Sequence, residues 1–208
     1  MHISALTIFP VKSLGPVALE SAEVTPRGLR GDRRWMLVDE IGRFVTRREL
    51  PALARIAMSL APGGYQLQAT EGQATLPLSV EGGALSNVIV WRDTVAAYVV
   101  DNDASHLVSE LAGRKLRFAY MPDETLRPVN PDYARAGEHV SFADGFPILV
   151  TSETSLATLN STLEAPVGMA RFRANIVLSG AVDAWAERDW SGITAGAVAM
   201  RFTKPCSR

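Results

Sequence analysis

Short runs in which apolar and polar residues alternate fill the first hundred positions of the chain, and turn residues separate them. Such alternation predicts strands with one buried face. The runs that fit are residues 4–9, 34–39, 43–46, 65–70, 74–80, 87–91 and 94–100. The tetrapeptide "DEIG" is a hairpin turn signal between the second and third of them. This spacing predicts a compact antiparallel β-barrel or sandwich.

Two segments have the spacing of a helix instead. In residues 103–113 the apolar side chains share one face, Asp103 is the predicted N-cap and Gly113 the predicted end. In residues 152–163 leucines recur at helical intervals, and Ser152 is the predicted cap. We therefore expect two helices among the strands.

The second half of the chain has a different pattern. Residues 114–121 read as a strand, and the polar, proline-containing residues 122–141 as a long loop, either a linker or a lid over a site. Residues 146–151 are a continuous apolar run that predicts a buried strand. Further strands are predicted at residues 171–180 and 197–205.

These elements predict a mainly β fold with a few helices, of the α+β class. The change of pattern near residue 120 divides the chain into a first domain, an N-terminal β-barrel at residues 1–120, and a second at residues 121–208. No internal repeat interrupts either part.

Composition limits the class of protein. A hydrophobic fraction of 47% with 21% charged residues is that of a soluble globular protein. No apolar run approaches the roughly 20 residues of a membrane span, and the start of the chain lacks the features of a secretory signal. A single cysteine, Cys206, cannot form an internal disulfide, which fits a reducing compartment, and we expect a cytoplasmic protein without a membrane partner.

The charge is balanced overall but unusual in kind. The net charge of −1 gives no global field that would gather nucleic acid, so we expect no nucleic-acid partner. Among 21 basic residues only Lys12, Lys115 and Lys204 are lysines. Codon bias is one explanation; the other is anion recognition, because a guanidinium group presents paired donors to phosphate oxygens. Only local clustering decides between them.

The usual signatures of protein-only catalysis are missing. The chain has no glycine-rich phosphate loop and no G-x-S-x-G nucleophile motif. His2, His106 and His139 stand singly, without the spacing of a metal site.

Four short stretches stand out against this background. "PVKS" follows the first strand, "RGLRGDRRW" concentrates four arginines, "SFADGFP" forms a turn before the buried run, and "RFRANIV" alternates basic and apolar residues. If the last stretch is a strand, Arg171, Arg173 and Asn175 project from one face, which is costly in a core unless the arginines are paired or face an anion. Each stretch also has an ordinary structural explanation: a solvated lysine, a salt-bridged surface, a common turn and an open strand edge.

The order of these stretches carries a resemblance. "IFPVKSLGP…GLRGDRRWMLVDEIGRFVTRRELPALA" resembles the N-terminal β-barrel domain of MOSC (molybdenum cofactor sulfurase C-terminal) proteins. "SFADGFPILVTSETSLATLN…RFRANIVLSG…FTKPCSR" is similar to the MOSC domain itself, so residues 121–208 are expected to form a partial, incomplete MOSC β-barrel. The pattern is most like YcbX proteins of bacteria and the mitochondrial amidoxime-reducing component.

The resemblance implies a function and a site. Such proteins bind molybdenum through a molybdopterin cofactor and one cysteine thiolate, and reduce N-hydroxylated compounds. The match places Lys12, Ser13 and Arg33 at the terminal phosphate of the cofactor, and Asp144 and Gly145 on a turn that contacts it. Arg173 and Asn175 match residues on the pterin and phosphate side, while Arg34 and Arg171 are neighbours that we rank lower.

The last residues depart from the family pattern. The family motif usually reads "PCSRC", and its second cysteine resembles the metal ligand, which would fall just beyond Arg208. Cys206 therefore matches a neighbour of that ligand and is a weak candidate for the metal, whereas Ser207 and Arg208 match residues beside the metal site. We expect a shortened chain in which the catalytic thiolate is absent.

Three functions remain open from the sequence. The first is a molybdenum-dependent oxidoreductase for N-hydroxylated compounds, supplied with electrons by a separate reductase or iron–sulfur protein, since the chain lacks the cysteines for a cluster. The second is a non-catalytic carrier of the pterin cofactor. The third is sulfur transfer through a persulfide on Cys206, whose thiolate the neighbouring cations Lys204 and Arg208 would favour.

Overall fold

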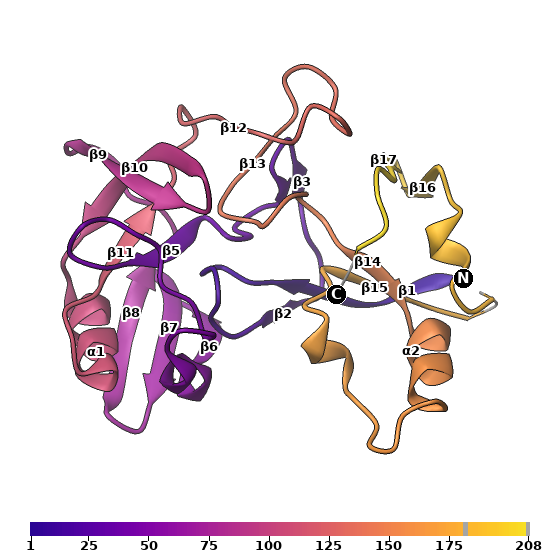
Figure 1. Cartoon of the computed structure of the whole chain (residues 1–208), viewed down its shortest axis with the longest axis horizontal. Helices are drawn as coiled ribbons and strands as arrows, with labels where there is room; N and C mark the ends of the chain where they lie inside the picture. Colours follow the sequence, from indigo (N-terminus) through magenta and orange to yellow (C-terminus); the bar gives the residue numbers. More distant parts are fainter. Residues whose placement is uncertain (181–182, 207–208) are drawn as a thin grey trace.

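The computed structural model describes residues 1–180 and 183–206. Strands make up 37% of the chain and helices 14%, which confirms the predicted mainly β, α+β class. In Figure 1 most strands form two groups, one at the left and one at the right of the molecule.

The first group contains a four-stranded antiparallel sheet, at the upper left of Figure 1. Its order is β5 (Trp35–Val38), β11 (Arg117–Tyr120), β10 (Asp93–Val100) and β9 (Leu85–Val90). The side chains of one face alternate along all four strands and bury a cluster with Phe142. The members of this cluster are Met36, Val38, Val88, Val90, Val95, Ala97, Ala119, Met121 and Phe142.

Residues 42–45 connect the two edges of this sheet. The backbone N–H of Phe44 donates to Ile89 of β9 at 3.0 Å, and the N–H of Val45 donates to Leu37 of β5 at 2.9 Å. The predicted strand at 43–46 is thus a bridging segment, which forms backbone hydrogen bonds with β9 on one side and with β5 on the other. Its preceding turn is fixed by the Asp39 carboxylate, which accepts from the N–H groups of residues 41 and 43.

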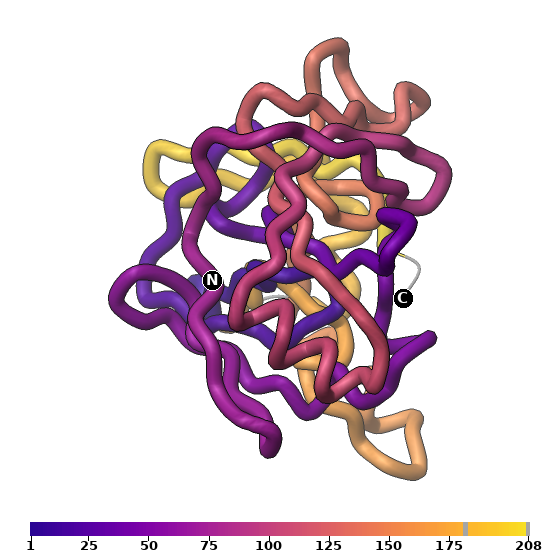
Figure 2. Tube along the Cα trace, turned by 90° about the vertical axis from the view of Figure 1, so that its left-hand side faces the viewer, coloured from indigo at the N-terminus to yellow at the C-terminus, as the bar shows by residue number. Residues whose placement is uncertain are grey.

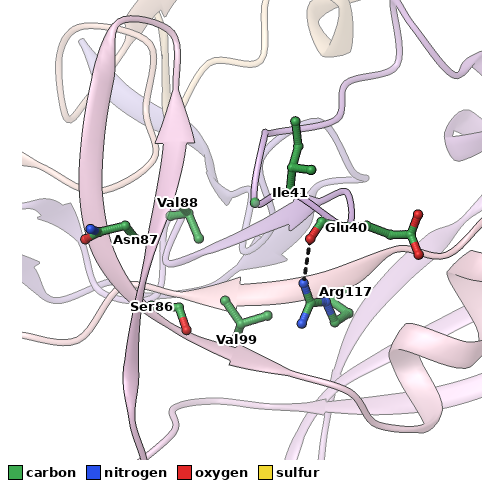
Figure 3. Close-up of a pocket in the computed structure, with 8 residues that line it drawn as sticks. Glu40, Ile41, Ser86, Asn87, Val88, Val99 and Arg117 are labelled. Atoms are coloured by element: carbon green, nitrogen blue, oxygen red, sulfur yellow. Dashed lines mark hydrogen bonds between the residues drawn. The ribbon is translucent and has the colours of Figure 1, made fainter.

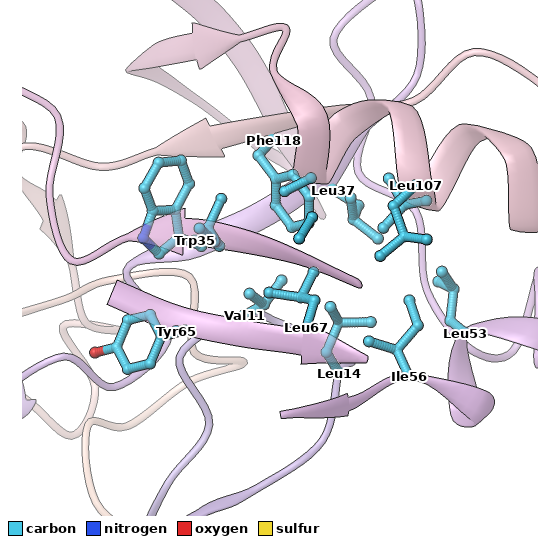
Figure 4. Close-up of a cluster of buried hydrophobic side chains, with 14 of the residues drawn as sticks. Val11, Leu14, Trp35, Leu37, Leu53, Ile56, Tyr65, Leu67, Leu107 and Phe118 are labelled. Atoms are coloured by element: carbon cyan, nitrogen blue, oxygen red, sulfur yellow. The ribbon is translucent and has the colours of Figure 1, made fainter. Parts of the chain in front are cut away.

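A second core lies between this sheet and a meander below it. The meander contains β6 (Ala57–Ala61), β7 (Gly64–Ala69) and β8 (Gly72–Pro77), with a 3-10 turn at Pro51–Arg55. Figure 4 shows Trp35, Phe118 and Leu37 facing side chains from the meander and its neighbours. The rings of Trp35 and Phe118 meet edge to face at 6.1 Å, a favoured aromatic geometry.

The two helices begin at side-chain caps, one of which differs from prediction. Helix α1 (Asp103–Ala112) is capped by Asn102, whose Oδ1 accepts from the N–H of Ser105 at 3.0 Å, so the assignment of Asp103 as cap is wrong by one residue. The left-handed Gly113 ends it as predicted, at φ 63°. Helix α2 (Glu153–Asn160) has its predicted cap, because the Ser152 hydroxyl accepts from the N–H of residue 155.

A further sheet joins the beginning of the chain to its last third. Its order is β14 (Val150–Ser152), β15 (Ile176–Ser179), β1 (His2–Ile8) and β2 (Val17–Leu19). β1 pairs antiparallel with β15, and β14 pairs parallel with β15. In the side view of Figure 2 the indigo and orange parts of the trace cross near the middle of the molecule. This pairing places the end of β1 beside the start of β15.

Two other predictions about the second half need correction. The apolar run 146–151 becomes a strand only from Val150, since residues 146–149 are irregular, and its residues are half-buried. The predicted loop 122–141 contains the short hairpin of β12 (Arg127–Pro128) and β13 (His139–Val140). Arg127 is buried there and donates to the carbonyl groups of residues 141 and 143, which orders the segment.

The remaining strands form two small hairpins. β3 (Val24–Thr25) pairs with β4 (Gly28–Leu29), and β16 (Gly192–Ala195) pairs with β17 (Val198–Arg201). Of these strands, β17 lies within the last strand predicted from the sequence, residues 197–205. Among residues 1–180 and 183–206, no helix has the length and apolar character that crossing a membrane requires. The boundary near residue 120 stays a prediction.

Candidate functional site

A cavity of about 470 Å³ lies where segments from both halves of the chain meet. Its described lining contains six cationic side chains and one carboxylate, that of Asp144. The cations are Lys12, Arg33, Arg47, Arg48, Arg171 and Arg173, and the remaining lining residues are Ser13, Thr46, Trp91, Ala170 and Phe172. This charge makes the cavity a site for anions.

A second cavity, of about 210 Å³, lies between the turn at residues 40–42 and strands β9, β10 and β11 (Figure 3). Arg117 there donates to the backbone oxygen of Glu40 at 3.3 Å, as the dashed line shows. Since Arg117 is the one cation in the described lining of this smaller cavity and donates to a carbonyl, the larger cavity is the better candidate for binding an anion.

Lys12 lies at the inner end of the larger cavity. It follows β1, and its backbone N–H donates to Trp35 at 2.8 Å, which fixes the segment against β5. The ammonium group donates to the carbonyl of Phe142 at 3.0 Å and pairs with Asp144 at 2.5 Å. Burial lowers the pKa of Lys12 from 10.5 to about 8, in spite of the opposing effect of Asp144. The charge of Lys12 is therefore held at an energetic cost.

Two aromatic rings enclose this ion pair. The Lys12 ammonium lies 5.4 Å from the ring centre of Trp91 and 5.8 Å from that of Phe44, within range of a cation–π interaction. The indole N–H of Trp91 donates to Asp144 at 3.2 Å. The pairing of residues 42–45 with β9 brings the rings together, with centres 4.8 Å apart.

Arg33 is a buried cation on the inner side of the cavity. It forms an ion pair with Asp32, which is itself buried and accepts from the N–H of Phe9 at 2.8 Å. It also donates to Asn175 at 3.2 Å and to the carbonyl of Arg173 at 3.3 Å. These contacts fix its guanidinium before any ligand arrives.

The other arginines of "RGLRGDRRW" serve structural contacts. Arg27 donates to the carbonyl groups of residues 123 and 125, Arg30 pairs with Glu23, and Arg34 donates to the carbonyl of Met121 and pairs with residue 123. The ordinary explanation holds for these three, and Arg33 alone of the four lines the cavity in the described part of the chain.

The prediction that Arg171, Arg173 and Asn175 share one strand face is wrong. Arg171 ends a 3-10 turn (Met169–Arg171), Arg173 has a left-handed φ of 57°, and β15 begins only at Ile176. A left-handed residue cannot continue a strand. The three side chains nevertheless come to one region, through a turn and not through strand alternation.

Arg173 and Asn175 have different parts there. The Arg173 guanidinium donates to the carbonyl of Leu14 at 2.7 Å and lies 4.0 Å over the ring of Phe9, at the cavity surface. Asn175 is fully buried beneath it and donates to Thr7 and Asp32, each at 3.1 Å. Asn175 thus supports the site and does not line it.

Strained backbone is concentrated at this cavity. Among residues 1–180 and 183–206, five non-glycine positions have positive φ, and four of them line the cavity. They are Ser13 at 71°, Arg33 at 48°, Trp91 at 55° and Arg173 at 57°. Because each such residue costs on the order of 1–3 kcal/mol, their clustering points to a functional constraint.

The remaining predicted residues lie at the edge of the site or outside it. Gly145 follows Asp144 on an exposed bend, in open space. Cys206 is exposed and is not in the described lining of the cavity. Ser207 and Arg208 lie outside the described residues. Within the described ranges no group of three His, Cys, Asp or Glu side chains could hold a metal ion.

The sequence reasoning missed six lining residues: Thr46, Arg47, Arg48, Trp91, Ala170 and Phe172. Two consecutive arginines after a predicted strand were the available signal. Nothing in the local pattern indicates that residue 44 pairs with residue 89, and this pairing brings both segments to the cavity.

Comparison with known proteins agrees with this arrangement. Residues 1–115 match the MOSC N-terminal beta barrel domain, and residues 137–208 match the MOSC domain. The chain is 31% identical to mitochondrial amidoxime-reducing component 1 of Xenopus laevis and 32% identical to that of Homo sapiens, over 99% of its own length. It is 29% identical to mitochondrial amidoxime reducing component 2 of Homo sapiens. The chain spans 63 to 64% of the length of these relatives.

The first family domain covers residues 1–115 and the second covers residues 137–208, and segments of both meet at the cationic cavity. The chain therefore belongs to the MOSC family, with a MOSC N-terminal barrel domain followed by a MOSC domain.

Proposed function

We propose that this protein binds a molybdenum–pterin cofactor in the cationic cavity and takes part in the reduction of N-hydroxylated compounds. Its relatives are named for amidoxime reduction, and an amidoxime is an N-hydroxylated compound. The observation that carries the proposal is the convergence of Lys12, Ser13, Arg33 and Arg173 on one cavity.

The donor set fits the anionic end of such a cofactor. A phosphate monoester presents three acceptor oxygens and nearly two negative charges at neutral pH. Lys12 and Ser13 follow one strand and Arg33 another, and Arg173 completes the group from the turn before β15. Because these cations are already fixed by protein contacts, an anion would bind without first ordering them.

The described residues supply the anion-binding part and no thiolate in the cavity, since Cys206 is exposed outside its lining. The cofactor, when bound, would supply the two-electron redox chemistry. This chain would hold its phosphate, and Asp144 and Trp91 would keep Lys12 in place. A separate electron-donating protein would supply the electrons, and the cytoplasmic location stays a prediction.

The test is cofactor retention. The wild-type chain and the variants Lys12→Ala, Arg33→Ala and Arg173→Ala would be produced in the same bacterial host, and pterin fluorescence and molybdenum content would be measured per mole of protein. We expect pterin with the wild type and a loss of about tenfold or more with each variant, because a charge-assisted hydrogen bond contributes about 1.5–3 kcal/mol.

The matched control is Arg135→Ala, which removes an exposed arginine outside the described cavity lining. It should retain as much pterin as the wild type. Equal pterin content in all variants, or none in the wild type, would refute the proposed cofactor site.

A further inference from the structure

We infer that Arg47 and Arg48 form a second oxyanion subsite, at the mouth of the cavity, which selects N-hydroxylated substrates that carry a carboxylate or phosphate group. This inference rests on the proposed function and names the substrate class of the same site.

Three of the four other cations of the cavity have protein partners, while the exposed Arg171 forms no ion pair within residues 1–180 and 183–206. Lys12 pairs with Asp144, Arg33 pairs with Asp32, and Arg173 donates to a carbonyl and lies over a ring. In contrast, Arg47 and Arg48 form no ion pair with any residue in the ranges 1–180 and 183–206. Their charge is thus available to a ligand.

Arg47 also has a donor that water does not reach. Its Nε is buried and has no acceptor in the part of the chain that the structure describes. Leaving such a donor unsatisfied costs about 1–3 kcal/mol, more for a charged group. Burial accordingly lowers the pKa of Arg47 below its usual range. An oxyanion in the cavity would offset the charge of this guanidinium and so compensate part of the cost.

One phosphate does not balance the cavity. The described lining carries six positive charges and one negative charge, a net +5. Asp32 already offsets the charge of Arg33, and a phosphate monoester brings about −2, so about two positive charges would remain beside the proposed cofactor. This excess of positive charge favours a second oxyanion in the same cavity.

Depth separates the two subsites. Lys12 and Arg33 are 6% and 9% exposed, whereas Arg48 is exposed and Trp91 is 47% exposed. The cofactor's phosphate belongs with the deep pair, and a substrate that enters from solvent meets Arg48 first. The bridging segment 42–45 holds both parts, because Arg47 lies two residues after it and Phe44 packs on Trp91.

The experiment compares amidoximes that differ only in charge. Benzamidoxime, 4-carboxybenzamidoxime and the phosphate ester of 4-hydroxybenzamidoxime would be titrated into the wild-type chain by isothermal calorimetry. We expect the two anionic compounds to bind at least about tenfold more tightly than the neutral one. The anionic compound that binds more tightly shows whether the subsite prefers a carboxylate or a phosphate group.

Each of the variants Arg47→Ala and Arg48→Ala should weaken the binding of both anionic compounds about fivefold to tenfold. The affinity for the neutral compound should change less than about twofold. Arg47→Lys should retain part of the preference, since it keeps the charge but not the fork of donors. Arg135→Ala is the control, and thermal melting confirms that each variant is folded.

The inference fails if the neutral and anionic amidoximes bind equally, or if Arg47→Ala and Arg48→Ala lower pterin retention as much as Lys12→Ala does. The second result would assign both arginines to the cofactor phosphate. Either result leaves the proposed function standing when the wild type retains pterin. Loss of pterin from the wild type with the charge preference intact would refute the cofactor alone.

Discussion

Lys12 is the residue at which burial and charge oppose each other most clearly. Its ammonium group is enclosed by Phe44, Trp91 and the Phe142 carbonyl, and Asp144 provides the one carboxylate in the described lining. Desolvation outweighs that carboxylate, so the pKa of Lys12 falls to about 8. Lys12 therefore changes charge close to physiological pH, unlike an ordinary lysine.

Anion affinity should consequently depend on pH in a way that Lys12 sets. Inorganic phosphate gains its second negative charge around pH 7, and this gain is nearly complete above about pH 8. Raising the pH above about 8 removes the Lys12 proton, and we expect calorimetric phosphate affinity to fall severalfold between about pH 8 and pH 9.5. Lys12→Arg should flatten this dependence; an equally steep decline in that variant would assign it to another group.

Linkage gives the same residue an opposite effect on stability. The folded pKa of about 8 lies below the ordinary 10.5, so the unfolded chain binds the proton more tightly. The contribution of Lys12 to the free energy of unfolding therefore rises as the pH increases from about 8 to 10.5. Binding and stability respond to the same proton with opposite sign.

At the scale of elements, the periodic segments could be predicted and the irregular ones could not. Strand β10 and helix α1 have regular patterns, and the structure contains both. The prediction of a strand at residues 171–175 was wrong because alternating basic and apolar residues suggest a strand. The left-handed conformation of Arg173 accompanies contacts with Leu14 and Phe9, which are distant in sequence. Family resemblance placed Lys12, Ser13 and Arg33 in the candidate site. A family pattern reflects contacts between residues that are distant in sequence, whereas a local pattern does not.

The start of helix α1 offers a local test. Asn102 caps the helix through the N–H of Ser105, whereas Asp103 is the first helical residue and its side chain is almost fully exposed. Asn102→Ala should lower the free energy of unfolding by about 1 kcal/mol, measured by urea denaturation, because the N–H loses its acceptor. Asp103→Ala should cost about 0.5 kcal/mol, through the helix dipole alone; the reverse ranking would restore Asp103 as the cap.

At the scale of the whole molecule, the two ends of the sequence depend on each other. β1 begins the chain yet pairs with β15, and the N–H of Thr7 donates to the carbonyl of Asn175 at 2.9 Å. The family domains at residues 1–115 and 137–208 therefore share a sheet. Neither the pairing nor its register has a local signature, since strand partners far apart in sequence are chosen by the complete fold.

Shortened chains should reveal this dependence. Residues 1–120 lack β15, whereas residues 1–180 retain it. By amide hydrogen exchange, we expect the N–H of Thr7 to exchange about 100-fold or more faster in the shorter chain, because its acceptor is missing. The N–H groups of β10, paired on both sides, should change less than about tenfold. Equal protection of the Thr7 N–H in both chains would show that the first domain stabilises β1 without the second domain.

The concentration of cations in one cavity also determines how an anion reaches it. Since the whole chain carries −1 and the described cavity lining +5, the rest of the molecule carries −6. An approaching anion is repelled by most of the surface and attracted at one mouth, so the field steers its diffusion toward productive encounters. Such steering acts on the association rate and weakens as ionic strength shortens the Debye length. A protein with a net charge close to zero can therefore still direct an anion to one place on its surface.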